Sequence, residues 1–257
     1  MKRGVPSLTE HEASRALRDW YGRPLGQLVA ADEQAELDRL LPDLFGYHLI
    51  QVGFATHSLF SASRILHRAV MCVGPPAGDD QAMFSGEPGA LPITSYTLDA
   101  LILHHTLEFS PDPRQVLREA ERTLVPEGHL VVLGFNPRGL WGLRRLFRRR
   151  RGRVPWDGRF LSAARVKDWL KVLGFEIVAC HPIVFRPPAE RQGLLQRLQF
   201  KERGAHRGWP LLGGAYVLLA RKKVMAMTPI KPRWRPRRAR VGLVDPAARR
   251  CEHDGAG

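Results

Sequence analysis

Apolar and polar positions follow a helical period at the start of the chain and change to short apolar runs after Gly46. Residues 7–21 begin with a serine cap and an acidic first turn, which predicts a short helix. Residues 26–45 carry four leucines on one helical face, which predicts a second helix. Beyond that point, strand-like and helix-like segments alternate, as in βαβ units around a parallel sheet. The expected strands are 47–52, 67–73, 98–103, 129–135, 175–180 and 214–221, and the expected later helices are 57–65, 113–124 and 162–173.

This order predicts an α/β fold with a three-layer, open and mostly parallel sheet, preceded by helices. We divide the chain into an N-terminal helical extension (1–45), a central domain (46–224) and a basic tail (225–257). The tail is rich in proline and arginine and has no apolar period, so we expect it to be extended or disordered.

Composition narrows the class of protein further. The 257 residues suit one domain with extensions, and 44% hydrophobic content is typical of a folded chain. The first residues are charged where a secretory signal needs an apolar run, and no segment reaches the roughly 18 apolar residues of a membrane span. Three scattered cysteines show no metal-ligand spacing. We therefore expect no transmembrane segment, no metal and a cytoplasmic location.

The net charge of +15 is concentrated in two segments. Residues 138–159 hold nine arginines against one aspartate, and residues 221–257 hold eleven lysines and arginines against three acids. Leucine, tryptophan and phenylalanine interrupt the arginines of the insert. Three interpretations stay open: contact with nucleic acid, contact with an anionic membrane surface, or a solvated charge run beside apolar residues that pack on the sheet. For the first two, the contacts would come from the tail and from Arg148, Arg149, Arg150 and Arg151.

Polar side chains gather directly after the apolar strand 98–103. His104, His105, Glu108 and Asp112 follow within nine residues of its end. A parallel strand delivers its carboxyl end to the ligand crevice of an open α/β sheet, so these side chains are candidates for ligand contact or proton transfer. The alternative is that they cap the next helix and bond to loop backbone.

At these residues the chain resembles class I S-adenosylmethionine-dependent methyltransferases of the type-11 family. The matching pieces are LPI at 91–93, the LEF-SPDP turn, REAERTLVPEGHLVVLGFNP, then FLSAARVKDWLKVLGFEIV and AYVLLARKK. The resemblance covers roughly residues 46–223 and is most specific in the second half. It implies a Rossmann-like fold and S-adenosylmethionine as the cofactor.

The same resemblance implies a set of cofactor-binding positions in the first half of the domain. Gln51 stands where the family has an acid, Gly53 keeps the first loop glycine, and Ala55 replaces the next. Glu87 matches the acid that would bind the adenine amino group, and the end of strand 98–103 would add Leu103 and His104. The second strand runs into Gly74 without the ribose-binding acid of the family.

Two functions from different classes follow. The first is in-line methyl transfer from S-adenosylmethionine to an unidentified acceptor, with His104, His105 and Asn136 as the acceptor-side residues. For Asn136 the alternative is a turn residue before proline. The second function is a catalytically silent relative that uses the fold as a binding or scaffold module for RNA or an anionic membrane.

Overall fold

We describe the protein from a computed structural model, in which the described residues are 10–53, 58–73, 83–139, 141–142, 144, 155–185 and 213–223. Contacts between Cα atoms divide the chain into two units, Met1–Val224 and Met225–Gly257, and every described element belongs to the first. The tail and most of the basic insert, including Arg148–Arg151, lie outside the described residues.

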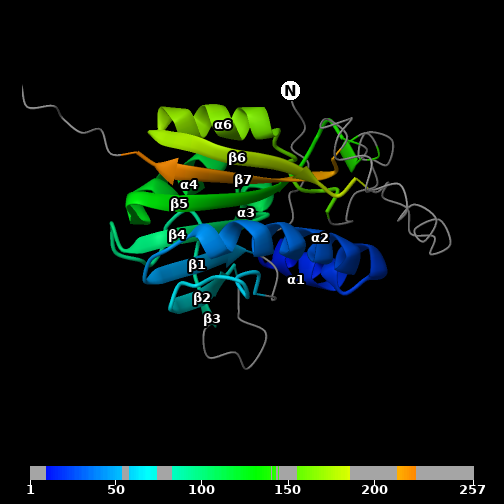
Figure 1. Ribbon diagram of the computed structural model, residues 1–257. Coiled ribbons are helices and arrows are strands. Elements are labelled where there is room, and N and C mark those ends of the chain that lie inside the picture. Colours follow the sequence, from blue (N-terminus) through cyan, green and yellow to red (C-terminus); the bar gives the residue numbers. More distant parts are fainter. Residues whose placement is uncertain are drawn as a thin grey trace, which may run out of the picture. The chain divides into compact units, whose positions relative to one another are not determined.

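A seven-stranded sheet of order β3-β2-β1-β4-β5-β7-β6 forms the centre of the first unit (Figure 1). Neighbouring strands from β3 to β5 pair in parallel, and β7 runs antiparallel between β5 and β6. The predicted α/β class and mostly parallel sheet are therefore confirmed. The strands are β1 (His48–Gly53), β2 (His67–Cys72), β3 (Met83–Ser85), β4 (Leu98–His104), β5 (Leu124–Phe135), β6 (Phe175–Ile183) and β7 (Ala215–Lys222).

Helices cover both faces of the sheet, which gives the three layers that the alternating pattern predicts. Alternate residues of β4 point to opposite faces, so Ile102 packs toward the N-terminal helices and Leu103 packs toward the later ones. The helices on the first face are α1 (Glu10–Tyr21) and α2 (Pro24–Leu40), followed by the short 3-10 turn η1 (Leu41–Asp43). On the second face lie α4 (Pro113–Thr123) and α6 (Ala163–Val172).

Local sequence explains where the later helices begin. Asp112 precedes Pro113, and its carboxylate accepts hydrogen bonds from the backbone N–H groups of Arg114 and Gln115. Ser162 accepts one from Arg165 at the start of α6, and Gly174, with φ of +85°, follows its end.

The structure corrects the expected elements at four places. The helix expected at 57–65 is wrong over its described part, because residues 58–66 form turns and irregular backbone there. The short strand β3 and the four-residue helix α3 (Thr106–Phe109) were not expected, and β5 begins five residues before the expected 129. No helix among the described residues is long and apolar enough to cross a membrane.

Candidate functional site

The carboxyl ends of β1 and β4 meet where the strand order reverses. From β1 the chain proceeds to β2 and β3 on one side, whereas β4 and β5 lie on the other. Gly53 and His104, the last residues of the two strands, are register partners. A Cβ on Gly53 would lie 2.8 Å from the carbonyl oxygen of His104, so only glycine allows this approach. Such a reversal is where open α/β sheets bind their ligands.

The backbone turns sharply as it leaves β4. His105 has φ 50° and ψ 22°, a left-handed conformation that few residues other than glycine adopt and that often marks functional sites. The next residue, Thr106, donates a hydrogen bond of 2.8 Å from its hydroxyl to the carbonyl of Val52. The turn therefore fastens the end of β4 to β1 and directs both histidine rings toward the N-terminal helices.

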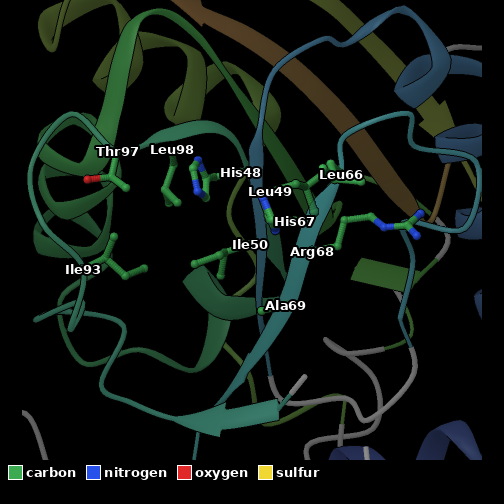
Figure 2. Close-up of a pocket in the computed structure, with 10 residues that line it drawn as sticks. All are labelled: His48, Leu49, Ile50, Leu66, His67, Arg68, Ala69, Ile93, Thr97 and Leu98. Atoms are coloured by element: carbon green, nitrogen blue, oxygen red, sulfur yellow. The ribbon is translucent and has the colours of Figure 1, made fainter. Parts of the chain in front are cut away.

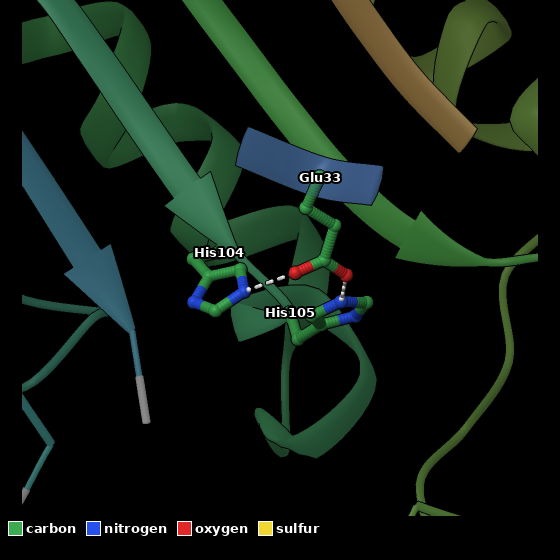
Figure 3. Close-up of side chains that lie close together, drawn as sticks. All are labelled: Glu33, His104 and His105. Carbon is green, nitrogen blue, oxygen red and sulfur yellow. Dashed lines mark hydrogen bonds and ion pairs between the residues drawn. The ribbon is translucent and has the colours of Figure 1, made fainter. Parts of the chain in front are cut away.

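Glu33 approaches the two histidines from α2, as Figure 3 shows. One carboxylate oxygen lies 2.8 Å from Nε2 of His105, and the other lies 3.1 Å from Nε2 of His104. None of the three side chains is exposed to solvent. A carboxylate buried to this degree is stable only when charge and hydrogen bonds compensate for the lost water, and the two imidazoles supply both.

Tyr21 and Glu108 extend this buried cluster at its two ends. The Tyr21 hydroxyl lies 3.1–3.2 Å from both oxygens of Glu33 and 3.1 Å from Nε2 of His104. Glu108 accepts a hydrogen bond from Nδ1 of His105 at 3.1 Å and another from the backbone N–H of Phe135 at 2.7 Å. Its second oxygen is buried and has no hydrogen-bond partner among the described residues. We call these five residues the α2–β4 cluster: Tyr21, Glu33, His104, His105 and Glu108.

The two histidines of the cluster differ in protonation. Burial opposes a charge on His105, yet its two carboxylate neighbours outweigh burial and raise the pKa of His105 to about 9. Burial lowers the pKa of His104 more than its contact with Glu33 raises it. Burial also opposes ionisation of Glu33, but His105 and His104 hold its pKa far below the ordinary range. At neutral pH, His105 is therefore an imidazolium, which donates from both ring nitrogens, and His104 is uncharged.

Burial, and then the negative charge of Glu33, raise the pKa of Tyr21 well above its ordinary value. Its hydroxyl therefore stays protonated and donates a hydrogen bond to the Glu33 carboxylate.

The residues that the family resemblance assigns to the cofactor are not all available to a ligand. Gln51 is buried, and its side-chain oxygen accepts a hydrogen bond from the backbone N–H of Leu59. Leu103 is buried in the core on the opposite face from the α2–β4 cluster. Glu87 is exposed just after β3, and Ala55 lies outside the described residues. Among the described residues of this set, Gly53 ends β1 at the reversal of strand order, and Glu87 is exposed after the edge strand β3.

Two other residues singled out in the sequence stabilise turns. Asn136 donates from its amide nitrogen to the carbonyl of Gly213, and its side-chain oxygen accepts from the N–H of Arg138. These bonds agree with the interpretation of Asn136 as a turn residue before proline. The carboxylate of Asp112 caps α4, as the alternative to ligand contact predicts.

Sequence reasoning identified three members of the cluster but did not identify Tyr21 and Glu33. The sequence did hold a signal for Glu33, because it lies in an apolar row with a spacing of four residues. All members of this row are buried on one face of α2: Leu25, Val29, Glu33 and Leu37. An acid at such a position needs a buried partner. Nothing in the sequence says that this partner lies 71 residues later, at the end of β4.

A separate pocket lies at the opposite edge of the sheet (Figure 2). It encloses about 390 Å³ between the amino ends of β1, β2 and β4. The rings of His48 and His67 stack there with centroids 5.2 Å apart. Because ligands of open α/β sheets bind at the carboxyl edge, this pocket is not where the fold predicts a cofactor.

Comparison with known proteins agrees with the sequence motifs. Residues 65–132 match the family model of the type-11 methyltransferases, described as a methyltransferase domain. The uncharacterized protein YafS of Escherichia coli (strain K12) is 28% identical over 234 residues, which cover 90% of this chain and 92% of that protein.

Solved structures support the same fold. One similar structure is an S-adenosylmethionine-dependent methyltransferase of Thermotoga maritima, described as a possible histamine N-methyltransferase. Its TM-score is 0.58 at 18% identity, and the match covers 84% of this chain and 100% of that one. The [4+2]-cyclase SpnF is also similar, with a TM-score of 0.50, 20% identity and coverage of 74% and 80%. At these identities the likeness establishes the fold alone, and the presence of a [4+2]-cyclase among the similar structures means that the fold does not specify the reaction.

Proposed function

We propose that this chain, which matches the type-11 methyltransferase model over residues 65–132, binds S-adenosylmethionine and transfers the methyl group to an unidentified acceptor. The observation that supports this most strongly is the reversal of strand order between β1 and β4, with Gly53 and His104 in register across it. Bound there, the cofactor would supply a methyl group that its sulfonium already activates.

Two residues are proposed to hold the cofactor. Gly53 leaves the end of β1 without a side chain, so that backbone can approach a ligand closely. Glu87 would accept hydrogen bonds from the adenine amino group with its exposed carboxylate. The buried amide of Gln51 is already bonded to the loop at Leu59, so we assign it to holding that loop.

On the acceptor side, His104, His105 and Asn136 stay predictions. Of these, His104 is the residue suited to accept a proton, because burial keeps its imidazole uncharged. Because Glu33 is ionised, the proton of this neutral ring lies on Nε2, which donates to that carboxylate, so Nδ1 is the nitrogen that could accept a proton. A protic acceptor would therefore have to reach the Nδ1 side of this buried ring.

Calorimetric titration with S-adenosylmethionine and with its demethylated product tests this proposal. We expect saturable heat with both. A ligand at a hundredfold excess over its Kd should stabilise the fold by about 2.7 kcal/mol. For a domain of this size, the midpoint temperature should rise by roughly 5–10 °C. Absence of both heat and stabilisation would remove the basis of the proposal.

Two matched variants locate the binding. Glu87→Gln should weaken binding, because the amide loses the charged acceptor for the adenine amino group. Asp43→Asn neutralises an exposed carboxylate just before β1 and should leave the affinity unchanged. Equal effects of the two substitutions would argue against the assigned position.

The alternative is a silent relative that serves as a binding module, and the charge distribution supports it. With nine arginines in residues 138–159, single-stranded RNA is the partner that we would test first, with anionic vesicles as the comparison. Within the described part of this insert, Trp141 is fully buried and its ring stacks on Phe135 at 5.6 Å.

A cytoplasmic location also stays a prediction.

A further inference from the structure

We propose that Glu33, His104 and His105 bind a divalent transition-metal ion, with Zn²⁺ as the best-matched ion. Each of these buried residues offers one ligand atom, and the three ligand atoms lie within 4.8 Å of one another. The site shares His104 with the acceptor side proposed above, but it does not depend on methyl transfer.

Distances within the cluster are close enough for the three side chains to converge on one metal ion. Zinc binds imidazole nitrogen at about 2.0–2.1 Å and carboxylate oxygen at about 2.0–2.2 Å, so ligand atoms of a tetrahedral site lie roughly 3.3 Å apart. The carboxylate oxygens of Glu33 lie 2.8 and 3.1 Å from the two histidine nitrogens. An ion would take the place of the protons that now join these atoms, and the three ligand atoms, which lie within 4.8 Å of one another, would draw in to the tetrahedral separation.

The residue types decide which ion fits. Two imidazole nitrogens and one carboxylate are typical ligands of zinc and of divalent iron, whereas calcium and magnesium prefer oxygen alone. Tyr21 offers a fourth donor, because its hydroxyl lies 3.1 Å from Nε2 of His104 and at a similar distance from Glu33. Two imidazoles and one carboxylate form a three-ligand set for Zn²⁺, whose fourth position would fall to the Tyr21 hydroxyl or to another oxygen.

The surroundings of His105 are those of a metal ligand. Its Nε2 faces the proposed ion, while Nδ1 contacts the carboxylate of Glu108 at 3.1 Å. Histidines that bind zinc commonly donate their other ring N–H to a carboxylate, which fixes the ring and strengthens the ligand. The backbone N–H of Phe135 in turn holds Glu108 at 2.7 Å. This outer contact is what distinguishes the cluster from a chance meeting of polar groups.

Charge balance favours a cation as well. Glu33 and Glu108 bring two carboxylates into the interior, and no lysine or arginine among the described residues pairs with either. A divalent ion would neutralise both carboxylates and leave the two imidazoles uncharged. It would also fasten α2 to the end of β4 and bind Nε2 of His104, so that this ring would keep no lone pair to accept a proton.

Metal content of the purified full-length protein is the first test. We expect one zinc ion per chain by elemental mass spectrometry. After removal of zinc by a chelator during unfolding, refolding with Zn²⁺ should restore one ion per chain and raise the midpoint temperature. A protein that binds no zinc, iron, manganese or cobalt under these conditions would overturn the proposal.

Variants assign the ligands. Glu33→Gln and His105→Gln should each abolish stoichiometric zinc binding, and Glu108→Gln should weaken it roughly 10–100-fold without removing it. Glu36→Gln is the matched control, because Glu36 lies one turn along α2 and contacts a single histidine, His181. Zinc retained at one ion per chain in Glu33→Gln, or lost equally in Glu36→Gln, would contradict the assignment.

Cobalt substitution keeps the test decisive if a variant fails to fold. Co²⁺ in the wild-type protein should show the strong visible absorption of a four-coordinate ion, without the charge-transfer band of a thiolate. A thiolate band would assign the ion to a cysteine, and the weak spectrum of hydrated Co²⁺ would mean that no site exists. The metal site and the proposed function can fail independently. Binding of the demethylated cofactor product to chelator-treated protein would show that the cofactor site exists even where no metal site does.

Discussion

The carboxylate of Glu33 lies 2.8 Å from Nε2 of His105, although 72 residues separate the two in the chain. This contact joins the N-terminal helices to the carboxyl end of β4, which is the edge where the fold binds ligands. The N-terminal extension thus contributes directly to the candidate site.

Replacing Glu33 tests how strongly this contact holds the fold. In chelator-treated protein, Glu33→Gln should lower the free energy of unfolding by about 3–5 kcal/mol, because it leaves a buried imidazolium with one carboxylate instead of two. Glu36→Gln should lower it by no more than about 1 kcal/mol, since its partner His181 is half exposed. Urea unfolding measures both, and similar losses would mean that the cluster adds nothing specific.

The sheet could be predicted from the sequence because its signals are local. The apolar run before His104 and the proline and aspartate before α4 fix their elements without reference to distant residues. The same local signals failed at 58–66, where the polar spacing resembles a helix but the chain forms turns. They failed also at β3, whose three residues are too few to show a period.

Only the residues that follow β4 in the candidate site could be predicted from the sequence. His104, His105 and Glu108 adjoin in the sequence, and their position after a parallel strand indicates a site. Tyr21 and Glu33 complete it through tertiary packing of α1 and α2, and no local pattern specifies where a helix will cross a sheet.

Gly53 provides a second test of the meeting point of β1 and β4. Gly53→Ala should destabilise the fold by about 1–3 kcal/mol, because the new methyl group would lie 2.8 Å from the carbonyl oxygen of His104. It should also weaken cofactor binding. Gly89→Ala is the control: its Cβ would meet no atom closer than 3.6 Å, and it should change stability by less than about 0.5 kcal/mol. Equal midpoints in urea would contradict the close approach.

Acid stability should depend on Glu119. A hydrogen bond from Arg122 lowers the pKa of this carboxyl, against the effect of burial, and the N–H of Leu91 contributes. A depressed pKa stabilises the fold above the ordinary value of 4.5, and this stabilisation is lost as the pH falls through the lower folded value. Glu119→Gln should therefore reduce stability at pH 6 and flatten its fall below pH 4.5.

The control for this pH profile is Asp168→Asn, which neutralises an exposed acid on α6. Urea midpoints from pH 3 to 6 measure both variants. A profile of Glu119→Gln that stays parallel to the wild type would show that Glu119 does not carry the effect.

The arginines of the insert can be tested through the salt dependence of RNA binding. Replacing Arg148–Arg151 with serine should reduce the slope of log K against log salt by about 3 for a single-stranded oligonucleotide, if all four contact phosphates. An unchanged slope would assign any binding to the tail or to neither segment. Binding to anionic vesicles alone would favour a membrane surface.

Amide hydrogen exchange with and without the demethylated cofactor product tests the central claim most directly. The claim predicts slower exchange at the carboxyl ends of β1 and β4, at residues 51–53 and 103–107, where the strand order reverses. Residues 48–50 and 66–69, at the pocket on the opposite edge, should exchange at unchanged rates. Protection confined to that opposite edge, or no protection at saturating ligand, would contradict a cofactor site between β1 and β4.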